Sequence, residues 1–231
     1  MSMHPSPPRG SARAVPDDAH GARTEDLRQA LAQKTALLHE IDHRVKNNLQ
    51  LVSSLLQLQA RRADDPAVRH ALRAAQTRIN AVAIVHRRLF QGEDAQAFDV
   101  AAFLRDMVDD AIGASGRADI RARLDLQPAE LPAAQAAPLA LLVSELLTNI
   151  VLHAFPGGVG GVVTVTLARD GERLRIEIAD NGVGVATTGV SPGIGQTIVG
   201  HLCDQLRAES RSTDACPGVR TVLRLPLNGA R

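Results

Sequence analysis

Between Thr24 and Arg62 the sequence contains neither proline nor glycine, and its apolar residues keep helical spacing. These residues recur at intervals of three, four or seven positions: Leu27, Leu31, Leu38, Ile41, Val45, Leu49, Val52 and Leu56. Such a stripe is typical of a long helix that packs along the seam of a helical bundle. The first part of the chain is therefore predicted to be one long helix.

A second helix is predicted directly after it. Asp64 or Asp65 provides a cap, Pro66 stands in the first turn and Gly92 follows the end. Its apolar stripe consists of Val68, Leu72, Ala75, Ile79, Val82 and Leu89. Two helices joined by a short turn form an antiparallel hairpin, which alone exposes much of its apolar seam. Pairing two hairpins into a four-helix bundle covers that seam, so a homodimer is expected.

The rest of the chain changes period. Helices are predicted at residues 99–116, 132–155 and 193–206, and alternating strands at 120–127, 161–169, 173–180 and 218–227. Because strands and helices mix without strict alternation, an α+β sandwich is favoured over a doubly wound sheet. Residues 1–24, rich in Pro, Ser, Gly and Arg, are predicted to be disordered. The expected domains are a helical hairpin at 25–95 and a sandwich at 96–231.

Composition excludes several classes of function. A net charge of +1 and 2% aromatic residues argue against a dedicated nucleic-acid surface. The two cysteines, Cys203 and Cys216, lack metal-ligand spacing and fit a reducing cytoplasm. No apolar run approaches the roughly 18 residues that span a membrane, and the start of the chain has no signal-peptide segment. A cytoplasmic protein without membrane insertion is expected.

One histidine stands in the stretch "EIDHRVKNNLQ", residues 40–50. At about 100° per residue, His43 falls roughly 150° from the apolar stripe, with Asn47 and Gln50 on the same outward face. It is therefore predicted to be exposed midway along the first helix. Position alone favours an inert surface histidine over a reactive one.

Three further patterns suggest a nucleotide site, the first of them on the helix at 132–155. Glu145, Asn149 and His153 follow one another at intervals of four residues, which forms a polar row on an apolar helix. An amide oxygen there suits Mg²⁺, a hard cation that keeps some of its waters. A solvated helix face is the alternative.

The other two patterns are glycine-rich. Asp180 ends an apolar strand and could accept a hydrogen bond from an exocyclic amine, while Gly182 and Gly184 permit close approach and positive φ. Gly193 and Gly195 begin a helix, where free N–H groups favour phosphate oxygens. Alone, the first pattern is usually a turn, and the second is neither a Rossmann fingerprint nor a P-loop.

Taken together and in this order, these pieces resemble the catalytic region of a sensor histidine kinase. Residues 43–50 read H-R-V-K-N-N-L-Q, the phosphoacceptor box of one subfamily, and "RINAVAIVHRRLF" is similar to that subfamily's second bundle helix. "ELLTNIVLHAF", "DNGVG" and "GIG" resemble the N, G1 and G2 boxes of the GHKL or Bergerat type of ATPase domain. The resemblance covers roughly residues 25–227.

The resemblance implies that Mg-ATP phosphorylates His43 and that an aspartate on a response-regulator receiver domain then accepts the phosphoryl group. It implies that Asn149 holds Mg²⁺, with Glu145 and His153 supporting the metal or the triphosphate. Asp42 either orients one ring nitrogen of His43 or pairs with a basic residue on the helix surface, and the sequence favours neither.

For the nucleotide itself, the resemblance implies that Asp180 binds the adenine amine and that Gly182 and Gly184 shape the wall beside it. Gly193 and Gly195 then open the phosphate side, and Thr221 on the last strand lies near the adenine.

Two positions depart from the family pattern. Leu152 stands where a basic residue usually precedes the N-box histidine, and the lid segment "VATTGVSP" between Gly184 and Gly193 is short. The alternative function is a histidine phosphotransfer protein with a degenerate ATP-binding domain, which relays phosphate between receiver domains through His43. In either case, the input signal is expected from a partner protein, a separate chain or a part of the protein outside this sequence, so a separate sensory protein is one of the expected partners.

Overall fold

The computed structural model describes residues 18–91, 97–184 and 194–227. Within those ranges, no side chain is described at positions 18–24, 38, 39, 42, 90, 91 and 194. The chain divides into two units, residues 1–43 and 44–231.

Helix α1 runs from Asp18 to Arg62 without interruption. It begins at Asp18 rather than at Thr24, so the prediction of disorder is wrong for residues 18–24, and the rest of that segment lies outside the described residues. The early start has a local reason, because Ala19 and Ala22 are strong helix formers and Gly21 costs only about 1 kcal/mol.

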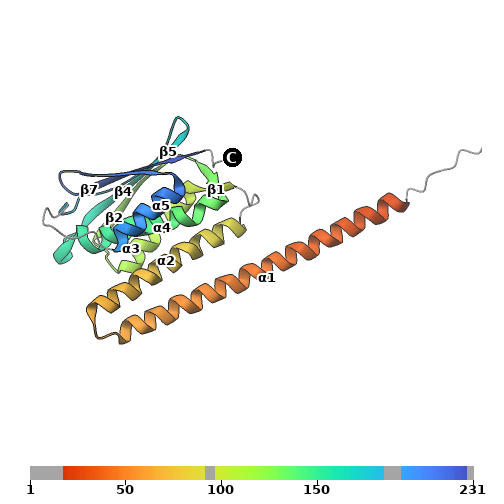
Figure 1. Ribbon diagram of the computed structural model, residues 1–231, viewed down its shortest axis with the longest axis horizontal. Helices are drawn as coiled ribbons and strands as arrows, with labels where there is room; N and C mark the ends of the chain where they lie inside the picture. The colour runs from red at the N-terminus through yellow and green to blue at the C-terminus, as the bar shows by residue number, and fades with distance from the viewer. Residues whose placement is uncertain (1–17, 92–96, 185–193, 228–231) are drawn as a thin grey trace, which may run out of the picture. The chain divides into compact units, whose positions relative to one another are not determined.

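Helix α2, Pro66–Gln91, follows after a short turn and returns antiparallel to the second half of α1 (Figure 1). Asp65 caps it, because the Ala67 N–H donates to Asp65 Oδ1 at 2.8 Å. The Ser53 hydroxyl donates to Asn80 Oδ1 at 3.0 Å and links the two helices. The predicted hairpin is confirmed, and Asp65 rather than Asp64 is the cap.

The remaining chain forms a sandwich of one sheet and one helical layer. The five-stranded sheet has the order β2-β4-β5-β7-β6, in which β2 and β4 are parallel and all other neighbours antiparallel. Helices α3, α4 and α5 lie on one face of this sheet (Figure 1). The bounds are α3 Val100–Ser115, β2 Ile120–Leu126, α4 Ala133–Asn149, β4 Gly161–Asp170, β5 Arg173–Asp180, α5 Ile194–Leu206, β6 Glu209–Asp214 and β7 Val219–Pro226. The α+β prediction is confirmed.

The core lies between the sheet and the helices. Alternate residues of β4 and β5 are buried, as period-two strands with one covered face require: Val163, Val165, Leu167, Leu174, Ile176 and Ile178. Ala81, Ile84 and Val85 of α2 belong to the same core. Because α2 packs here, the division of the chain at 43/44 does not coincide with the domain boundary predicted at 95/96.

Helix α4 and the turn after it differ from the prediction in two ways. The segment predicted as a single helix at 132–155 is α-helical only over Ala133–Asn149, and its last turn, Ile150–Ala154, is a π-helix. The stretch Ala133–Ala154 is also long and apolar enough to cross a membrane by length and composition, which corrects the expectation that no such run exists. Half of its most apolar window is buried, and α4 contacts α2, α3 and α5 as a core helix does.

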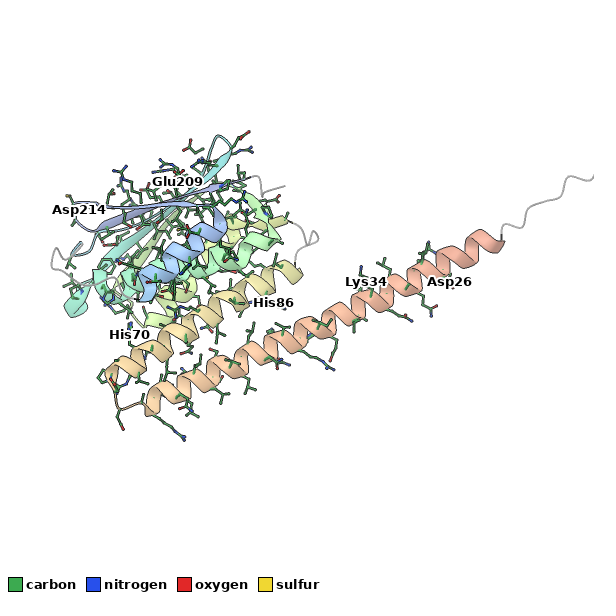
Figure 2. All side chains as sticks on the ribbon, in the orientation of Figure 1. Asp26, Lys34, His70, His86, Glu209 and Asp214 are labelled. Atoms are coloured by element: carbon green, nitrogen blue, oxygen red, sulfur yellow. The ribbon has the colours of Figure 1, made fainter. Side chains whose placement is uncertain are left out.

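Three short strands were not predicted. Strands β1, Ala97–Asp99, and β3, Glu130–Pro132, pair only with each other, antiparallel. Strand β6 is polar and exposed along its whole length, so it lacks the alternation on which strand prediction depends. Its ends, Glu209 and Asp214, are labelled in Figure 2.

Candidate nucleotide and phosphoacceptor site

His43 lies within α1 and is exposed, as its position relative to the apolar stripe predicts. Asn47 and Gln50 are exposed as well, whereas Val45 and Leu49 are partly covered. The imidazole is thus accessible from solvent in the described structure. The side chain of Asp42 lies outside the described residues, so its two predicted roles stay open.

Asp180 ends strand β5 and is buried, with 5% of its surface exposed. Its Oδ1 accepts a hydrogen bond from the Gly182 N–H at 2.9 Å, and no other described residue donates to this carboxylate. Gly218 packs directly against it, because a Cβ there would lie 1.9 Å from the Asp180 carbonyl oxygen and 2.8 Å from Oδ1. The carboxylate is therefore fixed, with Oδ2 left as an acceptor.

Gly218 was not among the predicted site residues. Its φ of +95° and its place against Asp180 both require glycine. The sequence carries one indication, because a glycine directly before a strand that pairs with β5 marks a close backbone approach.

Thr221 lies on β7 opposite Ile178 of β5, so Asp180 is its diagonal neighbour on the same face of the sheet. It is buried, and its hydroxyl lies 2.8 Å from the hydroxyl of Ser212 on β6. The structure thus brings Thr221 and Asp180 together. Ser212 was missed because β6 was not predicted.

Gly182 packs on the π-helix. A Cβ at Gly182 would lie 2.1 Å from the Ala154 carbonyl oxygen, and the Val183 N–H donates to that oxygen at 2.9 Å. Gly184 has a φ of +79°. Both positions need glycine, Gly182 for close approach and Gly184 for its backbone conformation.

The predicted polar row on α4 is divided between two environments. Asn149, the last residue of α4, and His153 in the π-helix are exposed, while Glu145 is buried. The Glu145 carboxylate accepts two hydrogen bonds from Arg78 of α2, from Nε at 2.6 Å and from Nη2 at 3.2 Å. Arg78 was missed, because nothing local in α2 distinguishes it from the other arginines. Leu152, the departure from the family pattern, is exposed.

The start of α5 lies beside Glu145. A Cβ at Gly195 would be 3.2 Å from Glu145 Oε2, so the structure brings these two predicted residues together. Gly193 and the lid segment 185–192 lie outside the described residues.

Arg117 fixes the loop that follows the π-helix. Its guanidinium donates to the carbonyl oxygens of Phe155 and Val159, each at 3.0 Å, and to the carboxylate of Asp119. The hydrogen bonds from Arg117 to the Asp119 carboxylate lower the pKa of Asp119 below its usual value. Sequence reasoning missed this residue, whose role depends on contacts with segments about forty residues away.

The donor set fits a magnesium nucleotide. Mg²⁺ is usually held by one or two protein oxygens together with substrate phosphates and waters, and the exposed amide of Asn149 can supply such an oxygen. Among the residues that the structure describes, no three His, Cys, Asp or Glu side chains form a metal cluster. Asp180, held beside Gly218 and Thr221, offers the acceptor that an exocyclic amine requires.

Comparisons with known proteins identify the family of the chain. Residues 40–115 match the family described as "Histidine kinase", and residues 117–222 match "Histidine kinase-like ATPase domain". Sensor histidine kinase PdtaS of Mycobacterium tuberculosis (strain CDC 1551 / Oshkosh) is 34% identical over 160 residues, which are 68% of this chain and 32% of the relative. Blue-light-activated histidine kinase 2 of Erythrobacter litoralis is 29% identical over 199 residues, which are 83% of this chain and 57% of the relative.

A solved structure shares the fold. The histidine kinase domain from the Erythrobacter litoralis EL346 blue-light activated histidine kinase aligns with a TM-score of 0.62 at 24% identity, over 80% of this chain and 95% of that one. The chain spans about a third of the length of the mycobacterial relative. The two family matches follow each other in the order of the hairpin and the sandwich, and the chain therefore belongs to the histidine kinases, whose catalytic region it carries.

Proposed function

We propose that this protein is an ATP-dependent histidine kinase of a two-component system, which phosphorylates His43 and then passes the phosphoryl group to an aspartate of a response regulator. The observation that carries the proposal is the fixed, buried carboxylate of Asp180. One oxygen is held by the Gly182 N–H, and the other is left to accept the adenine amine. Gly218 and Thr221 lie beside this carboxylate.

The chemistry requires positioning and charge neutralisation more than covalent participation of the protein. A neutral imidazole nitrogen of His43 attacks the γ-phosphorus, the bond from that phosphorus to the β–γ bridging oxygen breaks, and ADP leaves. Asn149 would hold Mg²⁺, which when bound neutralises charge on the phosphates. Glu145 and His153 flank Asn149 in sequence. Gly195 stands in the first turn of α5, where N–H groups favour phosphate oxygens, and Gly193 is proposed to open the same side.

The exposed apolar residues of α1 support a homodimer. Ile41, Val52, Leu55 and Leu58 are each more than 40% exposed in the single chain. Exposed apolar side chains repeated along one helix are typical of a surface that pairs with another protein. A second copy would cover them in a four-helix bundle. We further propose a cytoplasmic location.

The test is incubation of the purified protein with γ-labelled ATP and Mg²⁺, with H43A, N149A and D180N as variants. H70A is the matched control, because His70 is an exposed histidine on α2 (Figure 2). Acid-labile, alkali-stable label in the wild type and in H70A, but absent from the other three variants, is the expected result. Absence of both label and ATP binding in the wild type would refute the kinase. His43 would then be tested as an acceptor from a phosphorylated receiver domain.

A further inference from the structure

Arg78 is the residue through which α2 reaches the proposed nucleotide site. Its guanidinium binds the Glu145 carboxylate at two points, and the two side chains are only 28% and 10% exposed. A planar guanidinium in this bidentate geometry fixes the orientation of a carboxylate as well as neutralising its charge. The contact joins residues 67 positions apart and is therefore a tertiary feature of the fold.

The carboxylate so held lies at the start of α5. Its Oε2 faces Gly195, where an added Cβ would be 3.2 Å away. This is where the proposed function places the phosphates. An unpaired, largely buried carboxylate there would repel a triphosphate, and a surrounding of low polarity strengthens that repulsion.

No lysine contacts Glu145 in the described structure. The chain has two lysines, Lys34 and Lys46, and both belong to α1. Among the described residues, Arg78 is the one that pairs with the Glu145 carboxylate.

We propose that Arg78 is a positioning residue of the ATP site, which neutralises Glu145 and holds its carboxylate beside α5 so that a triphosphate can bind. This inference rests on the proposed function. It makes nucleotide affinity depend on α2, whereas the other proposed nucleotide contacts come from residues 145–221.

The test compares the affinities of ATP, ADP and adenosine in the presence of Mg²⁺, measured by calorimetry. The variants are R78Q, E145Q and the double variant R78Q/E145Q. R88Q is the matched control, because Arg88 of α2 makes a similar ion pair with Asp106 of α3, Nε to Oδ2 at 2.8 Å, with 25% of its side chain exposed.

We expect R78Q to bind ATP about tenfold more weakly, to lose less affinity for ADP and to bind adenosine unchanged, because repulsion grows with phosphate charge. In the double variant, the ATP affinity should return to that of E145Q, because the unpaired carboxylate is gone. R88Q should bind all three ligands as the wild type does.

Three results would overturn the proposal: an equal loss for all three ligands, ATP affinity in R78Q that is unchanged or increased, or no recovery in the double variant. An equal loss for all three ligands would mean that Arg78 only stabilises the packing of α2 against α4. If circular dichroism shows that R78Q is unfolded, R78K takes its place. We expect R78K to bind ATP more weakly and adenosine unchanged, and an unchanged ATP affinity would contradict the proposal. A wild type that binds no ATP would instead refute the proposed function.

Discussion

Gly182 is a position at which the structure leaves no room for a side chain. In G182A the new Cβ would lie 2.1 Å from the Ala154 carbonyl oxygen and 2.7 Å from both the carbonyl carbon and the Cβ of that residue. The obstructing atoms are mostly backbone, so no rotamer change relieves the clash. The loop after β5 or the π-helix must move, and the hydrogen bond from the Val183 N–H to the same oxygen is stretched or lost.

The magnitude follows from three contributions. Overpacking in a well-packed region costs about 1–3 kcal/mol. Loss of the hydrogen bond adds about 1 kcal/mol. The lower backbone freedom of alanine in the unfolded chain offsets about 0.4–1 kcal/mol. We therefore expect the free energy of unfolding to fall by about 1–3.6 kcal/mol, which lowers the Tm by roughly 2–14 °C in a domain of this size.

The assay is thermal and urea unfolding followed by circular dichroism, with G200A as the matched control. Gly200 lies within α5, exposed, with nothing within 4 Å of an added Cβ. Alanine there should raise stability by about 0.5–1 kcal/mol, because glycine disfavours a helix interior. If G182A and G200A had equal stability, the close packing of this loop on the π-helix would be refuted.

Three further perturbations have defined outcomes. D65A should lower the free energy of unfolding by about 1 kcal/mol through loss of the α2 cap, whereas D65N, measured in the same urea titration, should retain most of it. Arg117 lowers the folded-state pKa of Asp119 below the usual value of 3.8, so the contribution of this pair to stability is present above pH 3.8 and is lost as pH falls through the lower folded-state pKa. In D119N this pair's part of the decrease in Tm at acid pH should disappear from melting curves taken across pH. Asp214 raises the pKa of the exposed Cys216 thiol, so D214N should speed its reaction with a thiol reagent at pH 8, and an unchanged rate would show that Asp214 does not act on it.

The elements predicted correctly are those whose periodicity and end residues agree. Helix α3 was placed within a residue, and the structure shows why: Asp99 accepts from the Ala102 N–H at 2.9 Å and Gly116 ends the helix with a φ of +65°. Strands β4 and β5 alternate because one face of each is covered by helices. Gly184 has the positive φ that the sequence predicts, because that backbone requirement is local.

What could not be predicted depends on contacts between distant segments. The π-helix at 150–154 is accompanied by the packing of Gly182 and Val183 on Ala154, which no local pattern in α4 encodes. Strand β6 is exposed on every residue and exists because β7 offers it an edge, so its sequence needs no hydrophobic alternation. Residues of α2 likewise join the sandwich core only because α4 covers one face of α2, which the sequence of α2 alone does not indicate.

The polar groups missed from the sequence, Arg78 and Arg117, are of one kind. In each case the guanidinium group of an arginine donates hydrogen bonds to a carboxylate. Arg117 also donates to two backbone carbonyl groups. A lysine would supply the charge but not the two parallel hydrogen bonds, so it would leave the orientation of Glu145 or of the loop after the π-helix undetermined. Phosphoryl transfer depends on atoms held in place before the nucleotide arrives. Two residues that hold parts of the proposed site, Arg78 and Arg117, therefore lie outside the sequence boxes that identify it.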